Sequence, residues 1–258
     1  MGADLVYLGT LHDGIARSKS GRIFLDDLAA DNAIPLHKFR NMNDPDSVAG
    51  IRAARLDWLF VIGWSQIAGP DVLSAARNGA VGIHPTLLPR GRGRASVPWA
   101  ILKGLSATGV TMFQLEEGVD TGPILGQLTI PIAPTETATS LYRKVASAHR
   151  DLIRAVFPLL ESGEFVAVPQ NEKIATEWPG RSPADGAIDP SMSIEEVDRL
   201  VRATTRPYPG AFLRSEDTLT RVWSGSRSRP AGESVEIVCR DGIYFAVDFE
   251  IEASLADS

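Results

Sequence analysis

Short apolar runs alternate with polar, helix-like stretches through the first part of the chain. The runs that predict strands lie at residues 4–9, 34–39, 58–64 and 80–83. The stretches between them that predict helices lie at residues 22–33, 43–54 and 70–77. Because the run at 58–64 is apolar almost throughout, it is typical of a parallel strand covered on both faces. The alternation predicts a doubly wound α/β sheet.

The second part of the chain has a different pattern. Its predicted elements are a helix at 97–104, a strand at 108–115, a sheet-covering amphipathic helix at 137–163 and a capped helix at 193–203. From 211 to 247, short apolar runs separated by turn residues predict a small antiparallel β unit. Residues 169–190 are rich in proline, glycine and charge. We therefore expect a main domain at 1–170, a linker at 171–190 and a small C-terminal domain at 191–258.

Composition narrows the class of protein. The chain has 258 residues, of which 44% are hydrophobic, and can bury the core of one large domain or two smaller ones. It has no run of about 18 apolar residues and no signal-peptide pattern at its start, so we expect a cytoplasmic protein without a membrane span. A net charge of −6 argues against a nucleic-acid partner. The four histidines and single cysteine show no metal-ligand spacing, and Cys239 is predicted to be a buried strand residue.

Trp64, Ser65 and Gln66 follow the apolar run at 58–64. In doubly wound sheets, ligands bind at the carboxyl ends of central strands. This turn is therefore a candidate wall of a binding site. The alternative is that Trp64 packs beneath a neighbouring helix and Gln66 caps it.

His84 ends the predicted strand at 80–83 and is followed directly by Pro85. The loop beyond it is constrained by prolines and glycines and places three guanidinium groups, on Arg90, Arg92 and Arg94, within five residues. Guanidinium groups bind carboxylates and phosphates, so an anionic substrate could dock there. The alternative is a solvated basic loop whose partners are the acidic pair at 116–117.

A glycine-flanked turn at residues 116–122 carries Asp120. The turn can bring Asp120 back toward His84. A histidine held beside a carboxylate is a general-base arrangement, because the anion fixes the ring's tautomer. We therefore predict that His84 and Asp120 act together in catalysis.

Six segments occur in a fixed order along the chain. They are GIHPTLLP at 82–89, RGRG at 90–93, TGVT at 108–111, DTG at 120–122, RSPADGAID at 181–189 and RATTRPYPGAF at 202–212. Together they resemble the 10-formyltetrahydrofolate-dependent formyltransferase family, and the last two are similar to segments that follow the catalytic domain in sugar N-formyltransferases and methionyl-tRNA formyltransferases. The resemblance covers most of residues 34–225.

The resemblance implies a Rossmann-like catalytic domain followed by a smaller, β-rich C-terminal domain. It also implies transfer of a formyl group from 10-formyltetrahydrofolate to an amine, with a catalytic Asn, His and Asp. His84 and Asp120 match two of these. His84 would accept the proton of the attacking amine, and Asp120 would hold the ring or a bound water. Relatives usually open with an additional strand and helix before the unit that comes first here. Either this chain begins late or it lacks that unit, and the expected fold is the same in both cases.

The family's catalytic Asn is replaced by Gly82, two residues before His84. Loss of one oxyanion donor typically costs about 2.7–4 kcal/mol of transition-state stabilisation. Either another donor substitutes, or the chain is slow or inactive in transfer. Thr86, Gln66 and a water on the Gly82 backbone are the candidate donors.

Three loops are expected to surround one crevice that takes the folate cosubstrate. The expected folate-binding residues are Trp64, Gln66, Leu88, Pro89, Val119, Asp120 and Gly122. Arg90, Arg92 and Arg94 are expected to bind the acceptor.

The sequence therefore predicts an N-formyltransferase acting on a small-molecule amine, most plausibly a nucleotide-linked amino sugar. Two alternatives stay open: a methionyl-tRNA formyltransferase, and a non-catalytic folate-binding relative, which Gly82 favours. A homodimer is one of the oligomeric states open to the chain.

Overall fold

The computed structural model describes residues 2–16, 23–64 and 66–253, which divide into two compact units. Unit 1 consists of Met1–Arg92, Gly109–Leu128 and Ala148–Glu177, and unit 2 of Gly93–Thr108, Thr129–Ser147 and Trp178–Ser258. Each unit is therefore assembled from segments that are far apart in the sequence. Ser65, in the predicted binding turn, lies outside the described residues.

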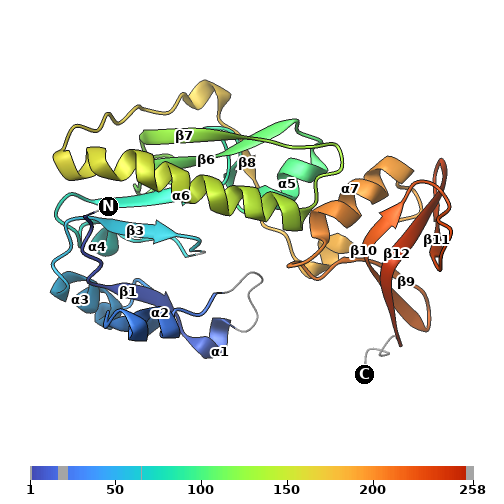
Figure 1. The fold of residues 1–258 in the computed structure, drawn as a ribbon, viewed down its shortest axis with the longest axis horizontal. Coiled ribbons are helices and arrows are strands. Elements are labelled where there is room, and N and C mark those ends of the chain that lie inside the picture. The colour runs from blue at the N-terminus through green and yellow to red at the C-terminus, as the bar shows by residue number, and fades with distance from the viewer. Residues whose placement is uncertain (1, 17–22, 65, 254–258) are drawn as a thin grey trace. The chain divides into compact units, whose positions relative to one another are not determined.

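Two sheets form the framework of unit 1 (Figure 1). In the first, β1 (Leu8–Leu11) pairs in parallel with β2 (Leu36–Phe39). The second has the order β3 (Leu59–Ile62), β4 (Ala80–His84), β6 (Ala107–Gln114) and β7 (Ile124–Pro131). β3 and β4 are parallel, whereas β6 runs antiparallel to β4. The predicted α/β class is confirmed, but the larger sheet is mixed, and β7 has no counterpart among the predicted strands.

Short helices cover the parallel strands of unit 1. They are α1 (Asp13–Ala16), α2 (Asp26–Asp31), α3 (Pro45–Ala53) and α4 (Pro70–Leu73). Proline opens both α3 and α4, where its missing N–H is not needed by the helix. Val48 and Ile51 of α3 pack with Leu59, Val72 and Ala80 in one buried cluster. The apolar strands predicted from sequence thus become the centre of a core.

Helix α6 (Ala138–Ser162) is the long amphipathic helix predicted from sequence (Figure 1). Its buried stripe, at helical spacing, consists of Leu141, Val145, Leu152, Val156 and Leu160. Leu152 and Val156 lie against Gly126 of β7, where a Cβ atom would come within 2.8 Å of Val156. Glycine on the strand therefore lets the helix approach the sheet closely. No helix within the described ranges has the length and apolar character needed to cross a membrane.

Residues 171–190, expected as a linker, carry regular structure. They contain β8 (Glu177–Trp178), which pairs with β5 (Arg92–Gly93), and two 3₁₀ turns, η1 (Glu172–Ile174) and η2 (Pro183–Gly186). The Arg92 amide donates to the Thr176 carbonyl at 2.9 Å. This segment is therefore tied to the loop that follows His84.

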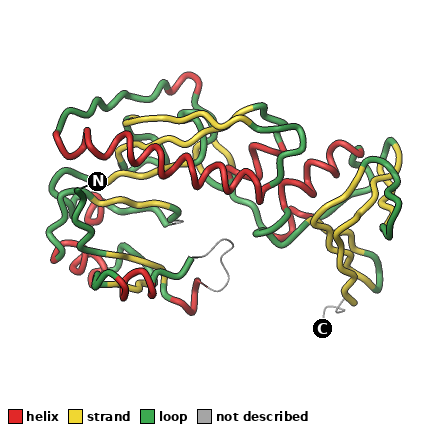
Figure 2. The backbone as a smooth tube through the Cα atoms, viewed as in Figure 1, coloured by secondary structure: helices red, strands yellow, loops and turns green. Residues whose placement is uncertain are grey.

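Unit 2 contains the small antiparallel sheet predicted for the C-terminal region (Figure 2). Its strands are β9 (Ala211–Arg214), β10 (Thr218–Ser226), β11 (Val235–Cys239) and β12 (Gly242–Ala253), in the order β11-β12-β10-β9. Helix α7 (Ile194–Thr204) packs on this sheet and against α5 (Ser96–Leu102). Val197, Val201, Val222 and Tyr244 are fully buried between them, and Cys239 is buried in β11 as predicted.

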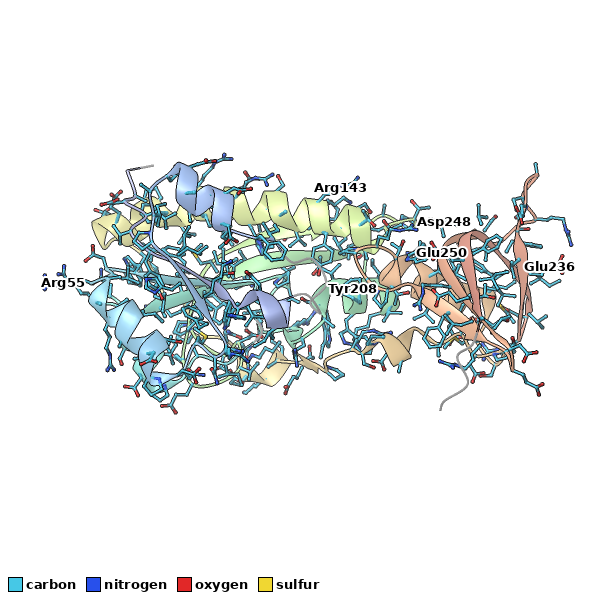
Figure 3. The ribbon with its side chains drawn as sticks, turned by 90° about the horizontal axis from the view of Figure 1, so that it is seen from below. Arg55, Arg143, Tyr208, Glu236, Asp248 and Glu250 are labelled. Carbon is cyan, nitrogen blue, oxygen red and sulfur yellow. The ribbon has the colours of Figure 1, made fainter. Side chains whose placement is uncertain are left out.

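Helix α7 begins with the cap predicted from sequence. Ser193 accepts a hydrogen bond from the Glu196 amide, and Glu196 accepts from the Ser193 amide at 2.8 Å. The sheet of unit 2 also carries exposed acidic side chains, among them Glu236, Asp248 and Glu250 (Figure 3).

Candidate active site

His84 is the last residue of β4, paired in register with Thr111 of β6. The residue is 8% exposed. Its Nε2 atom lies 2.8 Å from the Gly91 carbonyl oxygen, and its Nδ1 atom lies 3.4 Å from Oδ2 of Asp120. The structure therefore brings together the two residues predicted to act as a pair, although 36 positions separate them in the sequence.

Hydrogen-bond chemistry decides which ring nitrogen carries the proton. A carbonyl oxygen can only accept, so Nε2 carries a hydrogen and donates it to Gly91. Nδ1 is then the ring nitrogen that faces the Asp120 carboxylate.

The loop from Leu88 to Arg92 is held so that the Gly91 carbonyl faces His84. The Thr111 hydroxyl accepts from the Leu88 amide at 3.1 Å and donates to the Thr86 carbonyl at 2.7 Å. Gln127 donates to the Leu88 carbonyl and to Thr111, each at 2.8 Å. Leu88 and Pro89, predicted to contact folate, are buried in this network. Their predicted folate contacts remain a prediction.

Thr176 anchors the same loop from the region expected to be a linker. Its amide donates to the Pro89 carbonyl at 3.1 Å, and its hydroxyl accepts from the Gly91 amide at 2.9 Å. The contacts of Gln127 and Thr176 were not predicted from sequence, because each residue bonds to partners distant in the chain. Thr111 belongs to the TGVT segment at 108–111, but its position opposite His84 is known only from the strand pairing.

Asp120 lies in a strained turn. Its φ of 53° is in the left-handed region, which Asp tolerates better than most residues. The following Gly122 is required sterically, since a Cβ atom there would lie 1.8 Å from the Gln114 carbonyl oxygen. Backbone strain of this kind persists when the surroundings hold it, and it is commonly found at functional sites. Val119 of the same turn is 41% exposed, so it presents apolar surface beside Asp120.

Of the three arginines predicted to bind substrate, Arg92 is occupied within the protein. It is 7% exposed, and its guanidinium donates to Glu172 at 2.6 and 2.9 Å and to Gln170 at 2.8 and 3.1 Å. Its hydrogen bonds and charge hold the pKa of the Glu172 carboxyl below its usual range. The predicted anion-binding role of Arg92 is therefore corrected to a structural one, and its partner is Glu172 rather than the 116–117 pair. Arg90 and Arg94 are exposed, and their role stays a prediction.

Gly82, at the family's Asn position, faces apolar side chains. A Cβ atom at this residue would lie 2.8 Å from Cδ2 of Leu115 and 3.3 Å from the ring of Phe113. The space for an Asn side chain is thus filled by leucine and phenylalanine. Neither offers a hydrogen bond to an oxyanion.

The two residues of the predicted turn at 64–66 that the structure describes have packing roles. Gln66 accepts from the Met42 amide at 3.0 Å and donates to the Arg40 carbonyl at 2.7 Å. The Trp64 ring lies edge-on to Phe39, with 5.8 Å between centroids. Gln66 therefore ties two loops together, which agrees better with the structural interpretation of this turn, and a folate contact remains a prediction for both residues.

A second histidine, His149, lies near the pair. It follows Val145 by one helical turn on the buried stripe of α6, and its Nε2 atom is buried without a hydrogen-bond partner in the described part of the chain. Burial lowers the pKa of His149, and the nearby His84 lowers it further. Its helical spacing from Val145 was the feature of the sequence that could have predicted this buried position.

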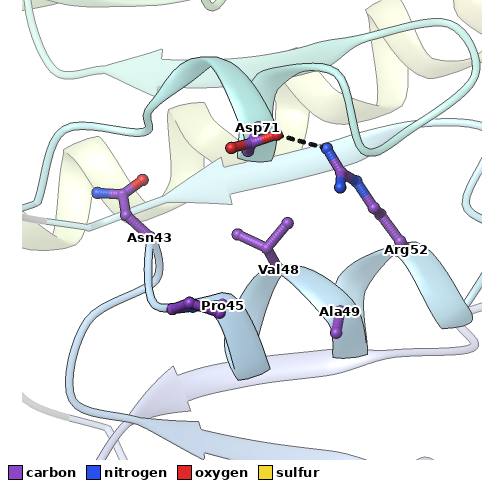
Figure 4. A pocket seen from close by; sticks show the side chains of 6 residues that line it. All are labelled: Asn43, Pro45, Val48, Ala49, Arg52 and Asp71. Atoms are coloured by element: carbon purple, nitrogen blue, oxygen red, sulfur yellow. Dashed lines mark hydrogen bonds and ion pairs between the residues drawn. The ribbon is translucent and has the colours of Figure 1, made fainter.

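A separate hollow lies between α3 and α4 (Figure 4). Asn43, Pro45, Val48, Ala49, Arg52 and Asp71 line it. An ion pair of 2.6 Å joins Arg52 to Asp71 there. The hollow contains none of the predicted site residues, so it has no part in the candidate active site.

Comparison with known proteins relates both regions of the chain to one family. Residues 13–157 match the family model described as formyl transferase, and residues 181–248 match the model described as formyl transferase, C-terminal domain. The first match covers more than half of the chain. The two models lie in the same order as the segments described above.

Solved structures share the fold at low identity. HypX from Aquifex aeolicus in complex with tetrahydrofolic acid is 19% identical with a TM-score of 0.70, and the match covers 96% of this chain and 44% of HypX. Methionyl-tRNA formyltransferase from Clostridium thermocellum is 19% identical with a TM-score of 0.65, and coverage is 96% and 99%. An N-formyltransferase from Helicobacter canadensis, in complex with folinic acid and dTDP-3-aminofucose, is 15% identical with a TM-score of 0.67, and coverage is 95% and 99%. The chain thus spans less than half the length of HypX but nearly all of the other two.

Proposed function

Because this chain belongs to the formyltransferase family, we propose that it transfers a formyl group from 10-formyltetrahydrofolate to the amine of a small acceptor. The observation that carries the proposal is the buried His84–Asp120 pair, with 3.4 Å between Nδ1 and Oδ2. A positioned imidazole whose tautomer is fixed is suited to take a proton from an attacking amine.

The chemistry follows from that geometry. The amine nitrogen attacks the formyl carbon, and the carbonyl becomes a tetrahedral oxyanion. His84 Nδ1 accepts the proton that the nitrogen loses, and Asp120 stabilises the imidazolium. The bond between the formyl carbon and N10 of the folate then breaks as the His84 imidazolium gives this proton to N10, leaving tetrahydrofolate, a formamide and neutral His84.

The oxyanion needs a donor other than the family's Asn. Of the two side chains considered above, Gln66 is engaged with Met42 and Arg40, whereas the buried Thr86 hydroxyl has no partner among the described residues. Buried hydroxyls in native structures are nearly always paired. Thr86→Val therefore tests a replacement donor directly: a fall in kcat with an unchanged fold supports it, and unchanged kcat excludes it.

The folate assignment has support from two relatives. HypX was solved with tetrahydrofolic acid and the Helicobacter enzyme with folinic acid. In this chain the exposed, apolar Val119 lies beside Asp120, and such surface suits a pterin ring.

The acceptor that we propose is a nucleotide-linked amino sugar. The Helicobacter enzyme was solved with dTDP-3-aminofucose and matches this chain over nearly its whole length. A net charge of −6 is poorly suited to binding a tRNA backbone. Methionyl-tRNA remains the second candidate, since the Clostridium enzyme is also matched at full length.

One assay distinguishes the three candidate functions. Purified protein and its His84→Ala variant are incubated with 10-formyltetrahydrofolate and, in turn, with dTDP-amino sugars, methionyl-tRNA or no acceptor, and formylated product is measured by mass spectrometry. Product from amino sugars that is lost in His84→Ala supports the proposal. Product from methionyl-tRNA supports the second candidate. Folate binding with no product from any acceptor points to the non-catalytic relative that Gly82 favours.

A further inference from the structure

One short segment contacts the supports of both His84 and Asp120. We call residues 168–177 the clamp segment. Its first residue, Val168, forms an antiparallel bridge with Ile124, just beyond the Asp120 turn, and its last residue, Glu177, belongs to β8. Gln170 and Thr176 each make several hydrogen bonds from it.

Gln170 holds the Asp120 turn. Its amide nitrogen donates to the carbonyls of Asp120 and Gly122, both at 2.8 Å, and its amide oxygen accepts from Arg92 at 2.8 and 3.1 Å. Guanidinium only donates and carbonyls only accept, so the amide can be placed in one orientation only. Both ends of this side chain are therefore fully committed. Arg92 is in turn held by Glu172.

Thr176 holds the loop whose Gly91 carbonyl contacts His84. Its hydroxyl accepts from the Gly91 amide at 2.9 Å, while its backbone bonds to Pro89 and Arg92 at 3.1 and 2.9 Å. The Gly91 carbonyl is the group that orients His84 through Nε2. Thr176 therefore acts on His84 through one intermediate residue, Gly91, whereas Gln170 bonds directly to the Asp120 backbone.

We propose that Gln170 and Thr176 are positioning residues that set the separation of His84 and Asp120 and the tautomer of the His84 ring. The left-handed backbone of Asp120 is a strained conformation that its surroundings must impose, and the Gln170 bonds to the carbonyls of Asp120 and Gly122 supply that restraint. The inference rests on the proposed formyl transfer for its kinetic test but not for its spectroscopic one.

Gln170→Glu is the sharpest substitution. It keeps the length of the side chain and the oxygen that faces Arg92, but it replaces two donated hydrogen bonds with repulsion between carboxylate and carbonyl oxygens. A misplacement of about 1 Å in a catalytic group can lower a rate about 10²-fold. We expect kcat to fall about 10- to 100-fold in Gln170→Glu and Gln170→Ala.

Thr176 offers a matched pair of variants. Thr176→Val keeps the shape and removes the hydroxyl, whereas Thr176→Ser keeps the hydroxyl. We expect kcat to fall in the valine variant and to stay near wild type in the serine variant. Lys173→Ala, an exposed position in the clamp segment, is the control and should leave kcat unchanged.

The ¹⁵N chemical shifts of the His84 ring test the inference without turnover. In the wild type, Nε2 should show the shift of a protonated nitrogen. Thr176→Val should move this signal toward that of a ring exchanging between tautomers, and Thr176→Ser should not. If the wild type transfers formyl to no acceptor, the proposed function fails while the spectra still decide the positioning role. Folded variants, verified by circular dichroism, with wild-type kcat and unchanged His84 shifts would overturn the inference. If the Gln170 variants do not fold, the valine and serine pair carries the test.

Discussion

Gly82→Asn introduces the residue that the resemblance described above implies at this position. In a site that had merely lost an oxyanion donor, the substitution would raise turnover by roughly 10²-fold. The structure leads us to expect the opposite. The added Cβ would lie 2.8 Å from Leu115 Cδ2 and 3.3 Å from the Phe113 ring. Contacts of 2.8 Å require a neighbour to move.

The size of the effect can be bounded. Overpacking a buried site typically costs about 1–3 kcal/mol. The lower end applies if the leucine methyl swings aside, because it is the far end of a flexible side chain. Phe113 is 2% exposed and has little room to follow. An amide left unpaired among these apolar groups adds about 1–3 kcal/mol more. We therefore expect a lower free energy of unfolding and no gain in turnover.

Urea unfolding and formyl-transfer kinetics on the same preparations would test this expectation. Gly82→Ala introduces the Cβ without the amide, so the difference between the two variants isolates the polar cost. Combining Leu115→Ala with Gly82→Asn removes the neighbour that the new side chain would contact. In a double-mutant cycle, the double variant should be about 0.5–3 kcal/mol more stable than the sum of the two single effects predicts. A Gly82→Asn protein that is as stable as the wild type and about 10²-fold faster would refute the reasoning.

The other predictions concern catalysis, folate and stability. His84→Ala should lower the transfer rate about 10²–10⁴-fold and Asp120→Ala should act in the same direction, with near-normal transfer by His84→Ala on the true acceptor contradicting the assignment. A non-reactive formyl-folate analogue should bind in calorimetry, and the absence of binding to folded protein would exclude the folate site. In unit 2, burial opposes the charge of Glu136, but hydrogen bonds from Lys144, Ser140 and the Ala133 amide outweigh it and hold its pKa below the ordinary 4.5. A carboxyl whose pKa is lower in the folded state stabilises the folded protein at pH values above its unfolded pKa. Glu136→Gln should therefore lower the free energy of unfolding at pH 7, and its difference from wild type should shrink as the pH falls below about 4.5. A difference that does not depend on pH would contradict this prediction.

Much of the chain's local structure was predictable from sequence. The apolar runs became β1 to β4 with shifts of a few residues at their ends, and the caps and prolines marked α3 and α7. His84 and Asp120 could be paired in advance because one ends a strand and the other lies in a turn shaped by glycine. Hydrophobic spacing, capping and turn chemistry act over a few residues, so they can be read from a linear pattern.

The tertiary structure decided what depends on distant contacts. β7 was not predicted as a strand, and its place beside β6 is decided by the sheet. Arg92 was expected to bind an anion, yet folding brings it to Glu172, 80 positions away. Gln170 reaches the Asp120 carbonyl across 50 positions. Such contacts form only after the chain has closed long loops, and their partners are fixed by the packed fold rather than by spacing in the sequence. The sequence thus indicated the candidate catalytic pair, and the folded chain determined what holds the two residues in place.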